Sequence, residues 1–169
     1  MHIFLIGFMG SGKSYWGRQW ASAHGLHFID LDQEIEKSTG LTITGIFEQK
    51  GEAWFREQEA ATLQAVITKE NCLVACGGGT PCFADNMKWM NANGITVYLQ
   101  ASAPFILDRI RHETQQRPLL KKLNPAELLF FIEQKLKERS PFYGQAQYLL
   151  KADALTADSL TAILNNVNT

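Results

Sequence analysis

The stretch IGFMGSGKSYWG, residues 6–17, decides the fold of this chain. Gly7, Gly12, Lys13 and Ser14 satisfy the pattern G-x-x-x-x-G-K-[ST], with an apolar strand-like run before it and a helical pattern after it. In such a loop the backbone N–H groups cradle phosphates, the lysine reaches the outer phosphates and the hydroxyl ligates Mg²⁺. The stretch therefore predicts a bound nucleoside triphosphate. It leaves open which molecule receives the phosphoryl group.

Short apolar runs alternate with helical patterns along the rest of the chain. Strands are predicted at residues 2–6, 27–31, 72–76 and 95–99, with a weaker candidate at 147–152. Helices are predicted at residues 13–24, 32–40, 42–50 and 52–69. This alternation predicts an α/β protein with a parallel sheet covered by helices on both faces. Ligands of such sheets gather beyond the carboxyl ends of the strands.

Length and composition restrict the class of protein. A chain of 169 residues fits a single domain, and its net charge of −1 gives no reason to expect a nucleic acid as partner. No run of about 18 apolar residues is present, and the N-terminus does not resemble a signal peptide. Cys72, Cys76 and Cys82 lack the spacing of a zinc site, so reduced thiols are expected. We expect a cytoplasmic protein that binds neither nucleic acid nor membrane.

Two aspartates provide candidates for the acceptor site. Phosphate-loop proteins commonly place an Asp at the end of a later strand to help hold Mg²⁺, but the third predicted strand ends in Cys76 and three glycines. Asp30 and Asp32 end the second predicted strand, two residues apart, so both side chains are expected on the same side. One carboxylate would face the Mg²⁺ water shell and the other the acceptor hydroxyl. Alternatively, Asp32 only caps the helix that begins at Gln33.

Glycines and arginines complete the candidate acceptor site. Gly77, Gly78 and Gly79 follow a buried strand, and three glycines in a row indicate a close approach of the backbone to a ligand. Arg56 lies on a predicted helix and Arg139 just past another; each alone fits an ordinary surface arginine. Two guanidinium groups and an aspartate together suit a small acid that carries hydroxyl groups.

These motifs, in this order over nearly the whole chain, resemble the shikimate kinase family. The matching segments are GFMGSGKS, DLD with IF fifteen residues on, FRExE, GGG, RPLL and R-x-P-x-Y. The resemblance implies a three-layer α/β sandwich with a central five-stranded parallel sheet, of the nucleoside-monophosphate-kinase type with a short lid. It also implies one monomeric kinase domain over residues 1–169, with the lid at about 111–124 and an acceptor-binding segment at about 32–60.

The activity implied is transfer of a phosphoryl group from ATP to the 3-hydroxyl of shikimate, with Mg²⁺, as a step of aromatic amino-acid biosynthesis. The implied catalytic residues are Lys13, Asp32 and Arg117. The implied ATP-binding residues are Gly10, Ser11, Gly12, Lys13, Ser14, Tyr15, Arg109 and Arg117, with Arg111 as the alternative to Arg109 beside the adenine. The implied shikimate-binding residues are Asp32, Arg56, Gly77, Gly78, Gly79 and Arg139. Ser14 would ligate Mg²⁺ directly, and Asp30 through water.

The sequence departs from the family pattern at a few positions, and two other classes of protein compete. Gly45 stands where an acidic residue is usual, Phe142 replaces a leucine, and the stretch YGQAQ at residues 143–147 is less acidic than expected. Another small-molecule kinase of the same fold, such as a gluconate kinase, is the first alternative. A nucleotide-binding module without activity is the second, and the presence of Lys13, Ser14, Asp32 and Arg117 argues against it.

Overall fold

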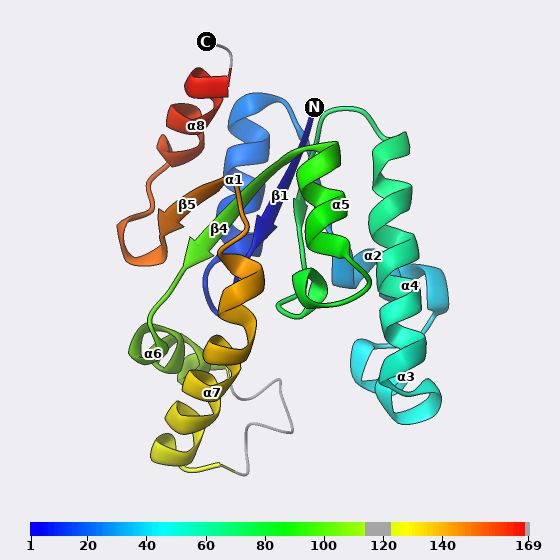
Figure 1. Ribbon diagram of the computed structural model, residues 1–169, viewed down its shortest axis with the longest axis vertical. Coiled ribbons are helices and arrows are strands. Elements are labelled where there is room, and N and C mark those ends of the chain that lie inside the picture. The colour runs from blue at the N-terminus through cyan, green and yellow to red at the C-terminus, as the bar shows by residue number, and fades with distance from the viewer. Residues whose placement is uncertain (114–122, 168–169) are drawn as a thin grey trace.

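A five-stranded parallel sheet forms the centre of the protein (Figure 1). The structure is a computed structural model that describes residues 1–113 and 123–167. The strands follow the order β2-β3-β1-β4-β5, and every neighbouring pair is parallel. Their bounds are β1 His2–Ile6, β2 His27–Asp30, β3 Cys72–Ala75, β4 Ile95–Gln100 and β5 Tyr148–Lys151. The α/β class and the five-stranded parallel sheet are thus confirmed.

Helices cover both faces of this sheet (Figure 1). The first four are α1 Lys13–His24, α2 Leu31–Thr39, α3 Ile43–Lys50 and α4 Glu52–Ala65. The others are α5 Asn86–Asn93, α6 Ala103–Glu113, α7 Pro125–Tyr143 and α8 Ser159–Val167. Short 3₁₀ turns lie at Val66–Thr68, Thr80–Cys82 and Ala152–Ala154. In the part of the chain that the structure describes, no helix is both long and apolar enough to cross a bilayer.

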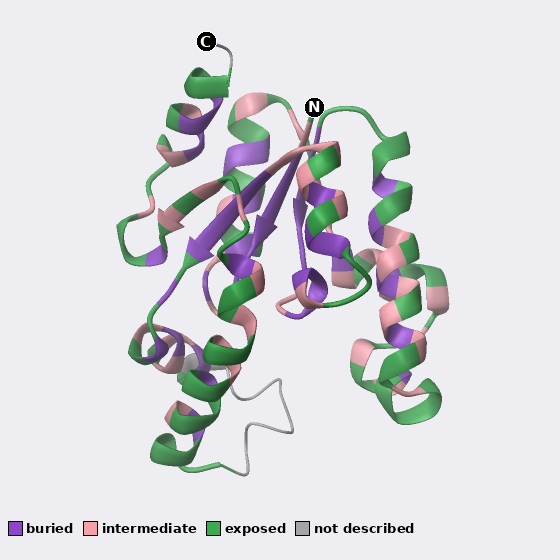
Figure 2. Cartoon of the chain, in the orientation of Figure 1, coloured by how far each residue is buried: buried purple, intermediate pink, exposed green. Residues whose placement is uncertain are grey.

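The three central strands, β1, β3 and β4, are buried along most of their length, as their nearly continuous apolar runs require, whereas the edge strands β2 and β5 are partly exposed (Figure 2). Ile3 and Leu5 point to one face, where Trp20 of α1 and the apolar side of α8 cover them. Phe4 and Ile6 point to the other face, toward α2, α4, α5 and the end of α7. Alternation along β1 therefore assigns α1 and α8 to one layer and α2, α4, α5 and the end of α7 to the other, while α6 and the first part of α7 pack in a separate cluster with Phe8.

Two local predictions were wrong. The second strand ends at Asp30 rather than residue 31, because Asp30 caps α2 by accepting from the backbone N–H of Gln33 (3.3 Å). Asp30 and Asp32 therefore belong to different elements. Arg139 lies inside α7 rather than past a helix, since α7 continues through Pro141 to Tyr143. Pro141 removes one N–H donor near the helix end, while burial of Tyr143 in the core holds the final turn.

Candidate active site

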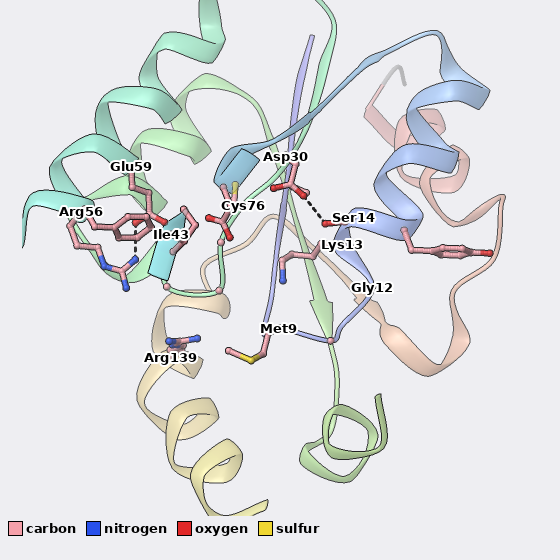
Figure 3. Close-up of a pocket in the computed structure, with 18 of the residues that line it drawn as sticks. Met9, Gly12, Lys13, Ser14, Asp30, Ile43, Arg56, Glu59, Cys76 and Arg139 are labelled. Carbon is pink, nitrogen blue, oxygen red and sulfur yellow. Dashed lines mark hydrogen bonds and ion pairs between the residues drawn. The ribbon is translucent and has the colours of Figure 1, made fainter. Parts of the chain in front are cut away.

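A cavity of about 580 Å³ opens beyond the carboxyl ends of the parallel strands (Figure 3). It brings together residues from the phosphate loop, from the start of α2, from α4, from the loop after β3, and from α6 and α7. Its lining includes Gly10, Gly12, Lys13, Ser14, Tyr15, Asp30, Asp32, Arg56, Gly77, Gly78, Gly79, Arg109 and Arg139. Residues far apart in the sequence thus meet at the place that the sheet rule predicts.

The phosphate loop joins β1 to α1 and passes close to β4. Gly7 adopts φ 145°, and a Cβ built there would lie 2.7 Å from the carbonyl oxygen of Leu99, so only glycine fits. Lys13 begins α1 and is 9% exposed. Its Nζ donates to the carbonyls of Gly7 (2.7 Å) and Phe8 (2.8 Å). The ammonium group is thereby held over the loop, where it can neutralise phosphate charge.

Ser14 and Asp30 form a pair of oxygen ligands beside this lysine. The Ser14 hydroxyl donates to Asp30 Oδ2 at 2.9 Å (Figure 3). Asp30 lies opposite Ala75 in the register of β2 and β3, so it stands at the end of the strand next to β3. Cys76 follows β3, and burial raises the pKa of its thiol far above the usual value, so this thiol stays neutral. A carboxylate, that of Asp30, therefore stands at the end of the neighbouring strand β2 rather than after β3.

A hydroxyl and a carboxylate suit Mg²⁺, which prefers oxygen ligands and usually keeps several waters and substrate phosphates in its shell. No cluster of three or more His, Cys, Asp or Glu side chains that could hold a metal occurs in residues 1–113 and 123–167. The arrangement of Ser14 and Asp30 fits the predicted ion.

Asp32 is the titratable group with the most informative environment. It lies in the first turn of α2, and its pKa is raised from 3.8 to about 6. Burial is the main cause, the charges of Asp30 and Glu59 add to it, and the charge of Lys13 opposes it. Its carboxylate has no hydrogen-bond or ion-pair partner among the residues that the structure describes. Asp32 is therefore a carboxyl group with a pKa near neutral and oxygens available to a ligand.

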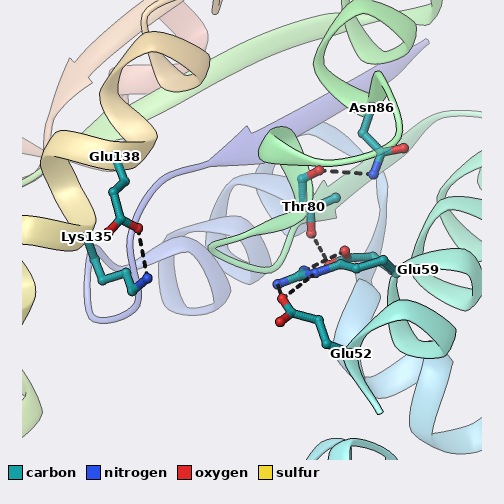
Figure 4. Close-up of polar contacts among 7 residues, drawn as sticks. Glu52, Glu59, Thr80, Asn86, Lys135 and Glu138 are labelled. Atoms are coloured by element: carbon teal, nitrogen blue, oxygen red, sulfur yellow. Dashed lines mark hydrogen bonds and ion pairs between the residues drawn. The ribbon is translucent and has the colours of Figure 1, made fainter. Parts of the chain in front are cut away.

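Arg56 belongs to a polar network that crosses from α4 to the loop after β3. Figure 4 labels its other members, Glu52, Glu59, Thr80 and Asn86. Its guanidinium donates to the carboxylate of Glu59 (2.8 Å) and forms an ion pair with Glu52 (3.2 Å). Glu59 is 1% exposed, and its second oxygen accepts from the hydroxyl of Thr80 (2.5 Å). The amide of Asn86 in turn donates to the Thr80 carbonyl (3.0 Å). Arg56 is thus a fixed cavity residue rather than a surface arginine.

Arg139 reaches the cavity from α7. The three glycines that follow Cys76, Gly77–Gly79, form a segment that we call the glycine loop, and Arg139 lies on the opposite side of it from Arg56 (Figure 3). A Cβ built at Gly78 would lie 3.0 Å from Arg139 Nη1, and one built at Gly79 would lie 2.7 Å from Arg56 Nη2. The absence of side chains at these two glycines lets both guanidinium groups reach the same part of the cavity. The lining holds the cations Lys13, Arg56, Arg109 and Arg139 and the carboxylates Asp30, Asp32 and Glu59, a balance that suits anionic ligands.

Other predicted site residues differ in how they meet the cavity. Arg109 lines it, with its guanidinium over the Phe105 ring at 4.8 Å, whereas Arg111 is exposed and outside the lining. Ser11 is buried and does not line the cavity; its backbone N–H donates to the Phe8 carbonyl (3.2 Å). Arg117 and most of the predicted lid lie outside the described residues.

Sequence reasoning assigned no role to Glu59, although the structure places it at the centre of the acceptor side. It lies three residues after Arg56 on the same helix, a spacing that puts both side chains on one face. This spacing was the feature of the sequence from which the pairing of Glu59 with Arg56 could have been predicted. Its contact with Thr80 spans 21 residues and has no signature in a single sequence.

Comparison with known proteins agrees with this geometry. A family model described as shikimate kinase matches residues 9–168. The shikimate kinase of Bacteroides thetaiotaomicron is 44% identical over 155 residues, which cover 92% of this chain and 89% of that protein. The shikimate kinase of Phocaeicola vulgatus is 44% identical over 171 residues, covering 96% and 98%. The chain belongs to the shikimate kinase family.

Solved structures place this shikimate kinase family member among its relatives. The crystal structure of the Bacteroides thetaiotaomicron enzyme superposes with a TM-score of 0.92 at 41% identity, covering 99% of this chain and 98% of that one. The Acinetobacter baumannii shikimate kinase, solved in complex with shikimate, gives 0.84 at 36% identity, with coverage of 99% and 92%. A gluconokinase from Sinorhizobium meliloti gives 0.58 at 20% identity, covering 99% and 95%, a likeness of fold alone. The chain is a small-molecule kinase that transfers phosphate to a hydroxyl group.

Proposed function

We propose that this enzyme transfers the γ-phosphoryl group of ATP to the 3-hydroxyl of shikimate, giving shikimate 3-phosphate and ADP. The observation that carries the proposal is Asp32, a carboxyl group with a pKa of about 6 and no hydrogen-bond partner among the described residues, which lines the same cavity as Lys13, Arg56 and Arg139. Membership of the shikimate kinase family supports it, and so does the relative solved with shikimate bound.

The acceptor side fits a small carboxylic acid that carries hydroxyl groups. We assign the carboxylate to Arg56 and Arg139, whose guanidinium groups flank the glycines Gly77–Gly79. The ring would lie against the backbone of these glycines, and the reacting hydroxyl would face Asp32. A carboxyl group with a pKa near the working pH is well matched to accept a proton from a hydroxyl.

The nucleotide side follows from the phosphate loop. We assign the phosphates to the backbone of Gly10, Ser11 and Gly12 and to Lys13, with Tyr15 beside the loop. Arg109 is our choice over Arg111 for the adenine side, because only Arg109 lines the cavity. Ser14 would bind Mg²⁺ directly and Asp30 would bind it through water; when bound, the ion neutralises charge on the phosphates.

Each of the assigned residues has a distinct role in the phosphoryl transfer. Asp32 takes the proton of the 3-hydroxyl, and the oxygen freed from it forms a bond to the γ-phosphorus as the bond to the ADP oxygen breaks. Lys13 stabilises the charge that collects on the leaving phosphate oxygens. The two arginines fix the ring so that its hydroxyl meets the phosphoryl group in line. We assign Arg117 to the transferring group as a cationic side chain supplied by the lid.

The test is ATP-dependent phosphorylation by the purified protein, followed by coupled detection of ADP. Shikimate should be phosphorylated efficiently, whereas gluconate and quinate should give at most a small fraction of that rate. Lys13→Met serves as the control for contaminating kinases. Equal or faster turnover of gluconate would favour the alternative kinase and overturn the proposal.

Several further assignments stay predictions. We propose a single kinase domain over residues 1–169, with a lid at about 111–124 and an acceptor-binding segment at about 32–60. We also propose a monomer that works in the cytoplasm and has no nucleic acid or membrane partner. The arrangement of described elements around one sheet supports the first of these proposals.

A further inference from the structure

The glycine loop after β3 has a long-range anchor that the proposed reaction does not explain. Tyr143, the last residue of α7, is fully buried, and its hydroxyl donates to the Gly78 carbonyl at 2.5 Å. The neighbouring carbonyls are held differently: Gly77 accepts from the N–H of Thr80 (3.1 Å) and Gly79 from the N–H of Cys82 (2.9 Å), both within the local turn. Tyr143 thus fixes the one carbonyl of the three that the turn leaves unbonded.

Fixing this carbonyl also fixes an amide donor. The Gly78 carbonyl and the Gly79 N–H belong to one planar trans peptide, so they point in opposite directions. Throughout the described part of the chain, the N–H groups of Gly78 and Gly79 have no hydrogen-bond acceptor. Both residues line the cavity. Without side chains, these glycines have only backbone contacts to hold their orientation.

The position of Tyr143 on α7 strengthens the argument. It follows Arg139 by four residues, so one helix face supplies both an acceptor-side guanidinium and the anchor of the loop. The Tyr143 ring packs against the Tyr98 ring with centroids 5.0 Å apart, which limits its movement. Burial raises the pKa of the Tyr143 hydroxyl above its usual value, so it keeps its proton and remains a donor.

We propose that Tyr143 is a positioning residue that orients the Gly78–Gly79 peptide so that the Gly79 N–H donates to an oxygen of the acceptor between Arg56 and Arg139. The inference rests on the proposed function for the identity of the acceptor. It extends that function by assigning acceptor affinity to a residue that does not itself touch the acceptor.

Tyr143→Phe removes one hydroxyl, which bonds the Gly78 carbonyl and also interacts with Arg139, and keeps the ring in the core. Amide exchange in the glycine loop, measured below, separates the effect on Gly78 from an effect through Arg139. The matched control is Tyr98→Phe, because the Tyr98 ring packs on Tyr143 but its hydroxyl has no hydrogen-bond partner in the residues described, and it faces a separate cavity. We expect Tyr143→Phe to raise the KM for shikimate by about fivefold or more, the usual effect of one lost hydrogen bond. The KM for ATP should change by less than about twofold, and Tyr98→Phe should change neither constant.

A second readout needs no acceptor. In the substrate-free protein, deuterium exchange of the amides in residues 76–83 should be several-fold faster in Tyr143→Phe than in the wild type or in Tyr98→Phe. A third readout uses the wild type alone: the Gly79 amide resonance should shift on addition of shikimate.

A wild-type enzyme that is inactive on shikimate but shows the expected exchange difference would overturn the proposed function and leave the anchor intact. Unchanged exchange, an equal loss toward ATP and shikimate, or a Gly79 resonance indifferent to shikimate would overturn the positioning role.

Discussion

Replacing Asp32 with asparagine should raise the free energy of unfolding of the substrate-free protein above pH 6 while it removes most of the turnover. In the folded protein, burial and the charges of Asp30 and Glu59 raise the pKa of Asp32 from 3.8 to about 6. Ionising this carboxyl group therefore costs more in the folded chain than in the unfolded chain. Asparagine has a similar shape and no charge, so it avoids that cost.

The sign and the size of this change in the free energy of unfolding follow from the number of protons that the folded and unfolded states bind at each pH. The folded state keeps the Asp32 proton up to about pH 6, whereas the unfolded state releases it near 3.8. The folded state thus binds more protons in this window, so its stability falls as pH rises from about 4 to 6 and stays lower above it. A difference of about 2 pKa units at about 1.36 kcal/mol each gives an upper limit of about 3 kcal/mol. Because Asp32 keeps partial contact with water, we expect a gain of about 1–3 kcal/mol at pH 8.

Urea unfolding of the wild type and of Asp32→Asn at several pH values between 5 and 8 measures this gain. It should increase by about 1 kcal/mol from pH 5 to pH 7 and then level off. Asp153→Asn, at an exposed position, is the matched control and should show no such trend. In the wild type, kcat/KM for shikimate should fall below about pH 6 as Asp32 gains its proton. A gain independent of pH, or a loss of stability at pH 8, would refute the reasoning.

Three other substitutions test separate parts of the structure. Lys13→Met should abolish turnover with a native circular dichroism spectrum, because its ammonium group serves phosphate rather than the core; near-normal rates would contradict this. Arg56→Lys should weaken shikimate binding in titration calorimetry by about 1.5–3 kcal/mol, since a point charge replaces a planar fork, with ATP affinity as the internal control. Gly17→Ala should lower the free energy of unfolding by about 1–2 kcal/mol, because its Cβ would lie 2.6 Å from the Phe28 ring; an equally stable variant would show that α1 can shift on the sheet.

The features of the fold that were predictable from sequence are those set by local patterns. The glycines and Lys13 of the phosphate loop are adjacent in the sequence, and their strand and helix flanks need no distant contact to be identified. The four strong strands were located within one residue at each end; for β1, β3 and β4 the reason is that parallel strands buried on both faces are apolar along their length. The wrong positions are at junctions, where capping by Asp30 and core burial of Tyr143 override the simpler pattern.

In the candidate site, too, local patterns were predictable from sequence and tertiary contacts were not. Asp30 and Asp32 were expected to meet the cavity because two residues in one strand share a face, but one ends β2 and the other begins α2. Both still line the cavity, because α2 begins directly after β2 ends and Asp32 lies in its first turn. The role of Tyr143 was beyond sequence reasoning for a different reason: its acceptor is a backbone carbonyl 65 residues away. The identity of a residue does not indicate which distant backbone carbonyl its hydroxyl will bond.

The contacts of the two neighbouring carboxyl groups support our proposal that Asp32, rather than Glu59, is the base. Both lie beside the same glycine: a Cβ built at Gly77 would be 3.1 Å from Asp32 Oδ1 and 3.2 Å from Glu59 Oε1. The two oxygens of Glu59 are occupied by Arg56 and Thr80, and its charge acts on Asp32. That charge helps raise the pKa of Asp32, whose own oxygens are unpaired among the described residues. The environment thus separates two neighbouring carboxyl groups into one that holds an arginine and one that we propose takes the proton of the acceptor.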